Sequence, residues 1–218
     1  MSDEPRREIL AAASRLFAAG GVGATTMAEI ARRSGLQQSS LYYYFHSKEA
    51  LLDALVTEAN RAPLELVERI RSEGGAPAVQ LYRLIRADVA ALSALPYDLN
   101  ELHRMAARDP RMFRRYWRER ERLIAAVTEI IAAGVASGEL RAIDPALSTL
   151  TILSNDEATQ HWLRGDLKRA SRRSRPSTVT ADPTEAGRFL ADLTLRGLMT
   201  RPASLEQIRR RARTLDDS

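Results

Sequence analysis

Hydroxyl, amide and amino groups are concentrated near the N-terminus, in residues 37–48, which read QQSSLYYYFHSK. Tyrosine and serine hydroxyls can donate hydrogen bonds to phosphate oxygens, and a glutamine amide can pair with the edge of an adenine. Lys48 follows Ser47, a residue able to N-cap a helix, so the lysine adds a cation beside free backbone N–H groups. This chemistry suits contact with a nucleic acid.

Helical spacing indicates which of these side chains can face outward. With 100° per residue, Phe45 falls about 40° from Leu41, so both belong to the buried side, whereas Ser39 and Tyr43 fall at about 160° and 200° and point outward. Ser40 and Tyr42 fall between the outward side and the buried side, and Tyr44 falls at the edge of the buried side. The spacing alone also permits a corner between two helices whose tyrosines only cover neighbouring helices.

Two helices are expected before this stretch. Apolar residues recur at i, i+4, i+7 and i+8 from Ile9, which predicts a helix that ends at Gly20-Gly21. Thr26 and Glu29 fit a capping box, which predicts a second helix that ends at Ser34-Gly35. These helices must position residues 37–48.

The third helix is expected from about Gln38 to His46. Gln37 is a poor N-cap, which costs about 1 kcal/mol and would let the helix begin a residue late. Two helices joined by a three-residue connection that contains Gly35 form a helix-turn-helix unit. Ser47 then caps a fourth, long helix.

Helical periodicity continues along the rest of the chain and strand signals are nearly absent, which predicts an all-α fold of about nine to ten helices. The longest helix is expected to start at Asp109-Pro110 and to end around Gly138. Residues 164–182 are basic and Ser-rich and are expected to form a mobile loop before two last helices, at about 183–200 and 204–215.

Composition excludes several kinds of protein. The 218 residues include no cysteine, so there is neither a disulfide framework nor a thiolate metal site. The net charge is +5, but six basic and six acidic side chains cancel within residues 1–56, so global charge does not decide the function. The start of the chain lacks the features of a signal peptide and no stretch is long enough to span a bilayer, which predicts a cytoplasmic protein.

Motifs for catalysis are missing from the sequence. No Gly-x-Ser-x-Gly elbow or Gly-Lys-Ser/Thr phosphate loop occurs, and the three histidines, His46, His103 and His161, lack the spacing of metal ligands. We therefore expect neither an enzyme nor a metal site, and no cofactor.

Residues 6–56 closely resemble the DNA-binding domain of the TetR family of transcriptional regulators. The matching positions are Thr26, Ile30-Ala31, Gly35-Leu36, Leu41-Tyr42, Tyr44-Phe45 and Ser47-Lys48-Glu49. The sequence departs from the family at Gln37 and Ser39, where the family often has Ser and Gly. The resemblance implies that Gln38, Ser39, Ser40 and Tyr43 face bases, and that Thr26, Tyr42, Tyr44 and Lys48 hold phosphates.

The same resemblance implies two domains, a helix-turn-helix domain at 1–50 and an effector-binding and dimerisation domain at 51–218. It implies a homodimer through a four-helix interface built from residues 144–163 and 183–200. Expected contributors, which could instead be buried within one chain, are Leu147, Leu150, Leu153, Phe189, Leu193 and Leu198.

An effector pocket in the bundle is also implied by the resemblance. Its candidate lining residues are Tyr97, His103, Met105, Phe113, Tyr116, Trp117, Arg120, Asn155, His161 and Trp162. Ordinary core packing is the alternative for each of them. Arg120 lies in the apolar register of its helix, so it either faces an acidic ligand group or extends its charged end to water, the reading that we favour.

The sequence thus indicates a ligand-responsive, DNA-binding transcriptional regulator, expected to be a repressor that a small hydrophobic effector releases from a palindromic operator. Its expected partners are double-stranded DNA, an effector of unknown identity and a second copy of the chain, and no membrane. One alternative is a DNA-binding protein of the same fold without an effector, such as a nucleoid-associated or cell-division factor. Another is an all-helical carrier of hydrophobic molecules that does not bind DNA.

Overall fold

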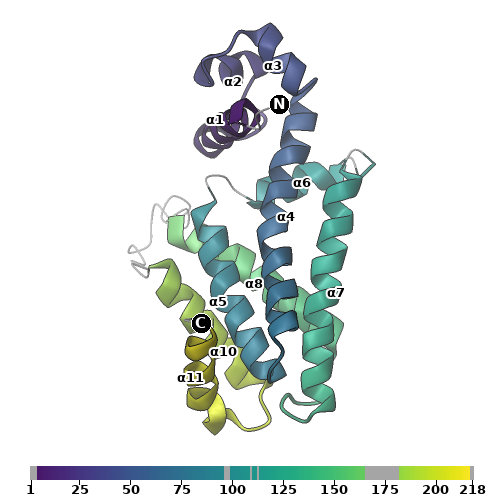
Figure 1. Ribbon diagram of the computed structural model, residues 1–218, viewed down its shortest axis with the longest axis vertical. Coiled ribbons are helices and arrows are strands. Elements are labelled where there is room, and N and C mark those ends of the chain that lie inside the picture. The colour runs from purple at the N-terminus through teal and green to yellow at the C-terminus, as the bar shows by residue number, and fades with distance from the viewer. Residues whose placement is uncertain (1–3, 96–98, 109, 112, 165–181, 217–218) are drawn as a thin grey trace, which may run out of the picture. The chain divides into compact units, whose positions relative to one another are not determined.

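The computed structural model describes residues 4–95, 99–108, 110–111, 113–164 and 182–216 (Figure 1). Within these ranges the chain is helical and forms no strand, which confirms the all-α prediction. The elements in order are α1 Glu4–Gly20, α2 Met27–Arg33, α3 Gln38–Tyr44, α4 Lys48–Glu73, α5 Pro77–Ala94, α6 Leu99–Arg108, α7 Arg114–Ala136, α8 Pro145–Arg164, α10 Pro183–Leu198, the 3₁₀ turn η1 Pro202–Ser204 and α11 Leu205–Asp216. No helix in these ranges is long and apolar enough to cross a membrane.

Contacts group the chain into two compact units. The first comprises residues 1–61 and 95–120, and the second comprises residues 62–94 and 121–218. Both α4 and α7 therefore contribute one part to each unit. The boundary expected after residue 50, between a helix-turn-helix domain and an effector-binding and dimerisation domain, remains a prediction.

Local signals in the sequence account for the helix-turn-helix in the first unit. Thr26 and Glu29 form both hydrogen bonds of a capping box at the start of α2, as predicted. The connection to α3 passes through Gly35 at φ +68°, a backbone conformation that favours glycine. Helix α3 begins at Gln38 although Gln37 makes no side-chain cap, and it packs against α2.

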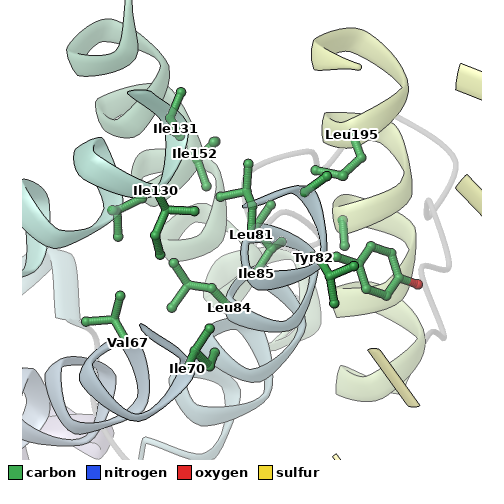
Figure 2. Packing of buried hydrophobic residues seen from close by; sticks show 14 of the residues in the cluster. Val67, Ile70, Leu81, Tyr82, Leu84, Ile85, Ile130, Ile131, Ile152 and Leu195 are labelled. Carbon is green, nitrogen blue, oxygen red and sulfur yellow. The ribbon is translucent and has the colours of Figure 1, made fainter. Parts of the chain in front are cut away.

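In the second unit, α5 packs against α8, α10 and α11. Its apolar side chains form one continuous core with residues from α4, α7, α8 and α10, as Figure 2 shows. Labelled members are Val67, Ile70, Leu81, Tyr82, Leu84, Ile85, Ile130, Ile131, Ile152 and Leu195. Gly187 lets α10 approach α5 closely, because a Cβ there would lie 2.8 Å from the carbonyl oxygen of Arg86.

Two sequence expectations are corrected. Helix α7 begins at Arg114 rather than at Asp109-Pro110, since residues 110, 111 and 113 form turns. At 23 residues it is shorter than the 26-residue α4, in which Pro63 is accommodated within the helix. The loop expected at 164–182 lies, apart from its two end residues, outside the described residues.

Candidate nucleic-acid interface

Helix α3 separates a buried side from an exposed side within seven residues. Leu41 is fully buried and the following Phe45 is 2% exposed, whereas Tyr43 is 72% exposed and Tyr42 is 44% exposed. Tyr44 is half-buried. The structure therefore confirms the burial pattern that helical spacing predicted for the aromatic run.

The remaining polar side chains of α3 share the exposed side. Gln38, Ser39 and Ser40 are all exposed in the first turn. The rings of Tyr43 and Tyr44 meet edge to face, with centroids 5.3 Å apart, so the outward Tyr43 is held by its neighbour. The result is a polar face with small hydroxyls and one projecting phenol, able to approach a groove closely.

Thr26 is occupied by the cap that it forms. Its hydroxyl donates to Oε2 of Glu29 across 2.8 Å and accepts from the backbone N–H of Glu29 across 3.3 Å. The backbone N–H of Thr26 also donates to Oε2 of Glu29, across 2.8 Å. This bond and the one from the hydroxyl hold the pKa of the Glu29 carboxyl below its usual range. The hydroxyl proton of Thr26 is thus already used, and the residue positions α2.

Lys48 makes contacts that sequence reasoning missed. Its Nζ donates to the carbonyl oxygens of Val22 and Thr25, each across 3.0 Å. One N–H of the ammonium is left for another acceptor. Because the two acceptors are backbone atoms more than twenty residues earlier, no local pattern in the sequence signals this tether.

A second contact within the first unit fixes the base of α3. The guanidinium of Arg6, in α1, lies over the ring of Phe45 at 4.7 Å from the centroid. This cation–π geometry packs the first helix against the C-terminal end of α3. Contacts with α1, α2 and the start of α4 therefore hold α3 and its polar face in place.

The effector candidates on α6 and α7 come together. Phe113 and Tyr116 are buried, and the ring of Tyr116 lies 5.6 Å from His103 and 4.9 Å from Trp117. The Trp117 indole N–H donates to the carbonyl oxygen of Ala106 across 3.3 Å. Arg120, in the next turn of α7, is half-buried. Met105 is in α6, but its side chain lies outside the described atoms, as does all of Tyr97.

The candidates on α8 belong to the second unit and have different surroundings. Asn155 is exposed and lines an open groove with Leu147 and Leu193, Trp162 is exposed, and His161 is half-buried. The next residue after Asn155, Asp156, is only 1% exposed. Burial raises the pKa of the Asp156 carboxyl well above its usual value, and the neighbouring Asp88 and Glu157 raise it further.

A half-buried acid occurs in the first unit. Partial burial raises the pKa of Asp53 in α4, while Arg115 lowers it and Glu119 raises it. Thr57, one turn later, is buried. Within the described residues no group of three or more acidic or histidine side chains is placed to hold a metal ion.

Comparisons with known proteins bear on this geometry. The family model described as "Bacterial regulatory proteins, tetR family" matches residues 9–55, which contain α2, α3 and most of α1. HTH-type transcriptional regulator RutR of Escherichia coli (strain K12) is 30% identical over 159 residues, which are 72% of this chain and 73% of that protein. The chain belongs to the TetR family.

Other matches within the TetR family are shorter or are matches of fold. Several curated HTH-type regulators are 33–43% identical over 51–75 residues, so the chain spans a quarter to about a third of their length. The crystal structure of Mycobacterium smegmatis AmtR is 27% identical, with a TM-score of 0.69 over 93% of this chain and 91% of that one. AibR, solved with isovaleryl coenzyme A and operator DNA, shares the fold at 20% identity and a TM-score of 0.71, over 91% of this chain and 98% of that one.

Proposed function

We propose that this TetR-family protein is a homodimeric transcriptional repressor, acting in the cytoplasm, that leaves a two-fold-related operator when a small hydrophobic effector binds. The observation that carries the proposal is the division of α3 into a buried side at Leu41 and Phe45 and an exposed side at Ser39 and Tyr43. A recognition helix needs this division, because one side must be fixed to the domain while the other enters the major groove.

The polar side chains of this face then take separate roles. Gln38, Ser39, Ser40 and Tyr43 contact base edges, since they are exposed on α3. Tyr42 and Tyr44 donate to phosphates. Thr26 and Lys48 act mainly by positioning, since the hydroxyl proton of Thr26 and two N–H groups of Lys48 are already donated within the protein; the third Lys48 N–H is available for a phosphate.

An apolar stripe on α8 and α10 supports the homodimer. Leu147 and Phe189 are each 65% exposed, and Leu150 and Leu193 are about half exposed, which is unusual for large apolar side chains on two adjacent helices. Leu153 is instead buried within the chain. A second copy covering the stripe would form a four-helix interface. A dimer is needed for two α3 helices to reach successive major grooves, which are about 34–36 Å apart.

An effector is supported by two observations. The aromatic cluster of His103, Tyr116 and Trp117, together with the buried Phe113, supplies apolar and hydrogen-bonding groups of the kind that line small-molecule sites. The fold of AibR, which this chain shares, holds an acyl-coenzyme A together with operator DNA in that protein.

The proposal is tested by selecting bound duplexes from a random DNA pool at near-physiological salt. We expect a two-fold-related sequence to be enriched, and Tyr43→Ala to abolish the enrichment while Tyr43→Phe retains part of it. Enrichment of no sequence, with binding that disappears as salt rises, would contradict the operator and favour the effector-free architectural alternative. Absence of binding, even by protein refolded from denaturant to remove any ligand, would contradict DNA recognition.

A further inference from the structure

A hollow of about 440 Å³ lies in the second unit, where the turn after α7 and the turn after α10 meet the start of α5. Sites for small molecules are commonly of this size. The hollow shares no residue with the polar face of α3, the aromatic cluster of α6 and α7, or the apolar stripe on α8 and α10. The proposed function therefore leaves it unexplained.

Hydrogen bonds hold the two turns against each other. The backbone N–H of Arg141 donates to Leu198 O across 2.9 Å, and that of Thr200 donates to Glu139 O across 3.0 Å. Side chains add two further links, from Arg141 Nε to Met199 O across 3.0 Å and from Thr200 Oγ1 to Gly138 O across 2.8 Å. The walls are thus fixed before any ligand arrives, which lowers the entropic cost of binding.

The floor of the hollow is apolar. Ala78 and Val79 from α5, Met199 from the turn and Ile208 from α11 all line it, and each is less than 10% exposed. The carboxylate of Glu139 also lines it, but Oε2 accepts from the backbone N–H of Ala78 across 3.1 Å at the start of α5. Its negative charge is partly neutralised there by the N-terminal end of the α5 dipole.

Two arginines complete the lining. Arg201, before η1, and Arg211, in α11, are both exposed. Neither guanidinium forms an ion pair or side-chain hydrogen bond with any residue that the structure describes. Arg209, two residues before Arg211 in α11, is by contrast bound to Asp192 and Glu206. Guanidinium groups bind carboxylates and phosphates with two parallel hydrogen bonds.

We propose that this hollow binds a small organic anion, whose carboxylate or phosphate head lies between Arg201 and Arg211 and whose short apolar body contacts Met199 and Ile208. Because two unpaired guanidiniums lie beside a buried apolar floor, the hollow selects a compound that has both an anionic head group and an apolar body. An inorganic anion lacks the body, and a neutral compound of the same shape lacks the head. The site is independent of DNA and of the proposed effector.

The test uses the full-length protein labelled with ¹³C at the methionine methyl groups. Met199 is on the floor of the hollow, and its resonance is assigned by Met199→Leu. We expect hexanoate or hexyl phosphate to shift this resonance in a saturable way below about 10 mM, in the range of weak specific binding. Comparing the two probes identifies the preferred head group. Hexanamide and inorganic phosphate should have little effect.

Matched variants connect the shift to the two arginines. Arg201→Gln/Arg211→Gln should weaken probe binding at least about tenfold, because each guanidinium contributes charge-assisted hydrogen bonds. Arg196→Gln/Arg210→Gln, which removes the same two charges from exposed positions outside the hollow, should bind the probes as the wild type does. All these variants should unfold at the wild-type temperature, because the replaced groups are exposed.

The proposal is overturned if neither charged probe shifts the Met199 resonance, if hexanamide shifts it equally, or if the double variant binds with unchanged affinity. An equal response to inorganic phosphate would overturn the role of the apolar floor. A failure of the DNA selection would not affect any of these outcomes, since none of them requires DNA.

Discussion

The ammonium of Lys48 donates to the carbonyl oxygen of Thr25 across 3.0 Å, although 23 residues separate the two. The same Nζ contacts Val22 O at the same distance. The first residue of α4 is therefore tied to the segment that leads into α2, the helix that α3 packs against. The Lys48 ammonium therefore stabilises the segment and the helix α2 that support α3, in addition to any attraction that it has for phosphate.

Lys48→Met should accordingly destabilise the protein as well as weaken DNA binding. Loss of two hydrogen bonds from a half-buried charged group should lower the free energy of unfolding by about 1–2 kcal/mol, measured by urea denaturation. Arg15→Gln, which removes an exposed cation from α1, should leave stability unchanged. If Lys48 served only as a phosphate contact, its replacement would leave the free energy of unfolding unchanged. It would reduce the slope of log affinity against log salt concentration by about one.

The capping box of α2 should make stability depend on pH. Hydrogen bonds from Thr26 lower the pKa of Glu29 in the folded protein, so the ionised carboxylate stabilises the fold above its unfolded pKa. This stabilisation should be lost as the pH falls through the lower folded value. Glu29→Gln should flatten the acid side of the stability profile, measured by urea midpoints between about pH 5 and 3. A profile identical to that of the wild type would contradict this role.

Removal of the Thr26 hydroxyl tests the same cap at neutral pH. Thr26→Ala should cost about 1 kcal/mol of unfolding free energy, and Thr26→Ser, which retains the hydroxyl, only a fraction of that. Thermal or urea unfolding measures both. Equal losses in the two variants would indicate that the threonine methyl group, rather than the cap, stabilises α2.

Arg83 is a buried cation that links three parts of the second unit. It is 5% exposed, and it donates to Glu73 Oε2 across 2.5 Å and to Asp216 Oδ1 across 2.7 Å. Glu73→Gln/Asp216→Asn leaves the guanidinium buried without a counter-charge and should cost about 3 kcal/mol. Arg83→Met should cost less, since the two carboxylates are about one-third exposed and can be hydrated. The reverse order in urea denaturation would contradict this account.

Asp156 should make the protein less stable as the pH rises. Burial, together with Asp88 and Glu157, raises its pKa in the folded state, so the folded protein holds a proton that the unfolded chain has released. Stability is therefore lost as the pH rises from the unfolded pKa towards the folded one. Asp156→Asn should remove this slope, and its advantage over the wild type should grow with pH. Glu121→Gln, at an exposed position, is the control and should retain the wild-type slope.

The apolar stripe on α8 and α10 predicts the oligomeric state. Leu147→Asp/Phe189→Asp should change the mass measured by light scattering from twice the chain mass of 24.3 kDa to a single chain, because carboxylates are costly to bury in an apolar interface. Operator affinity should fall with it. Ala146→Asp, at the adjacent exposed position of α8, should remain a dimer. A wild-type protein that is monomeric at micromolar concentration would contradict the interface.

Much of the recognition unit could be predicted from the sequence, because it depends on residues close together in the chain. The Thr26–Glu29 cap and the glycine turn at Gly35 are local features. Helical periodicity likewise separates the buried Leu41 and Phe45 from the outward Tyr43, since the geometry of a helix is the same wherever it packs.

Only the tertiary structure decided which distant groups meet. Lys48 is bound to backbone oxygens of a preceding loop and Arg83 to a carboxylate 133 residues later. The hollow proposed to bind an anion arises where two turns are joined by backbone hydrogen bonds. On α8, helical spacing separates Leu147 from Leu153 by about 120°, but it does not say which of the two faces the core; in the structure Leu153 is buried and Leu147 is exposed. Such pairings depend on how the helices pack, and packing is set by the summed contacts of the whole core rather than by any local pattern.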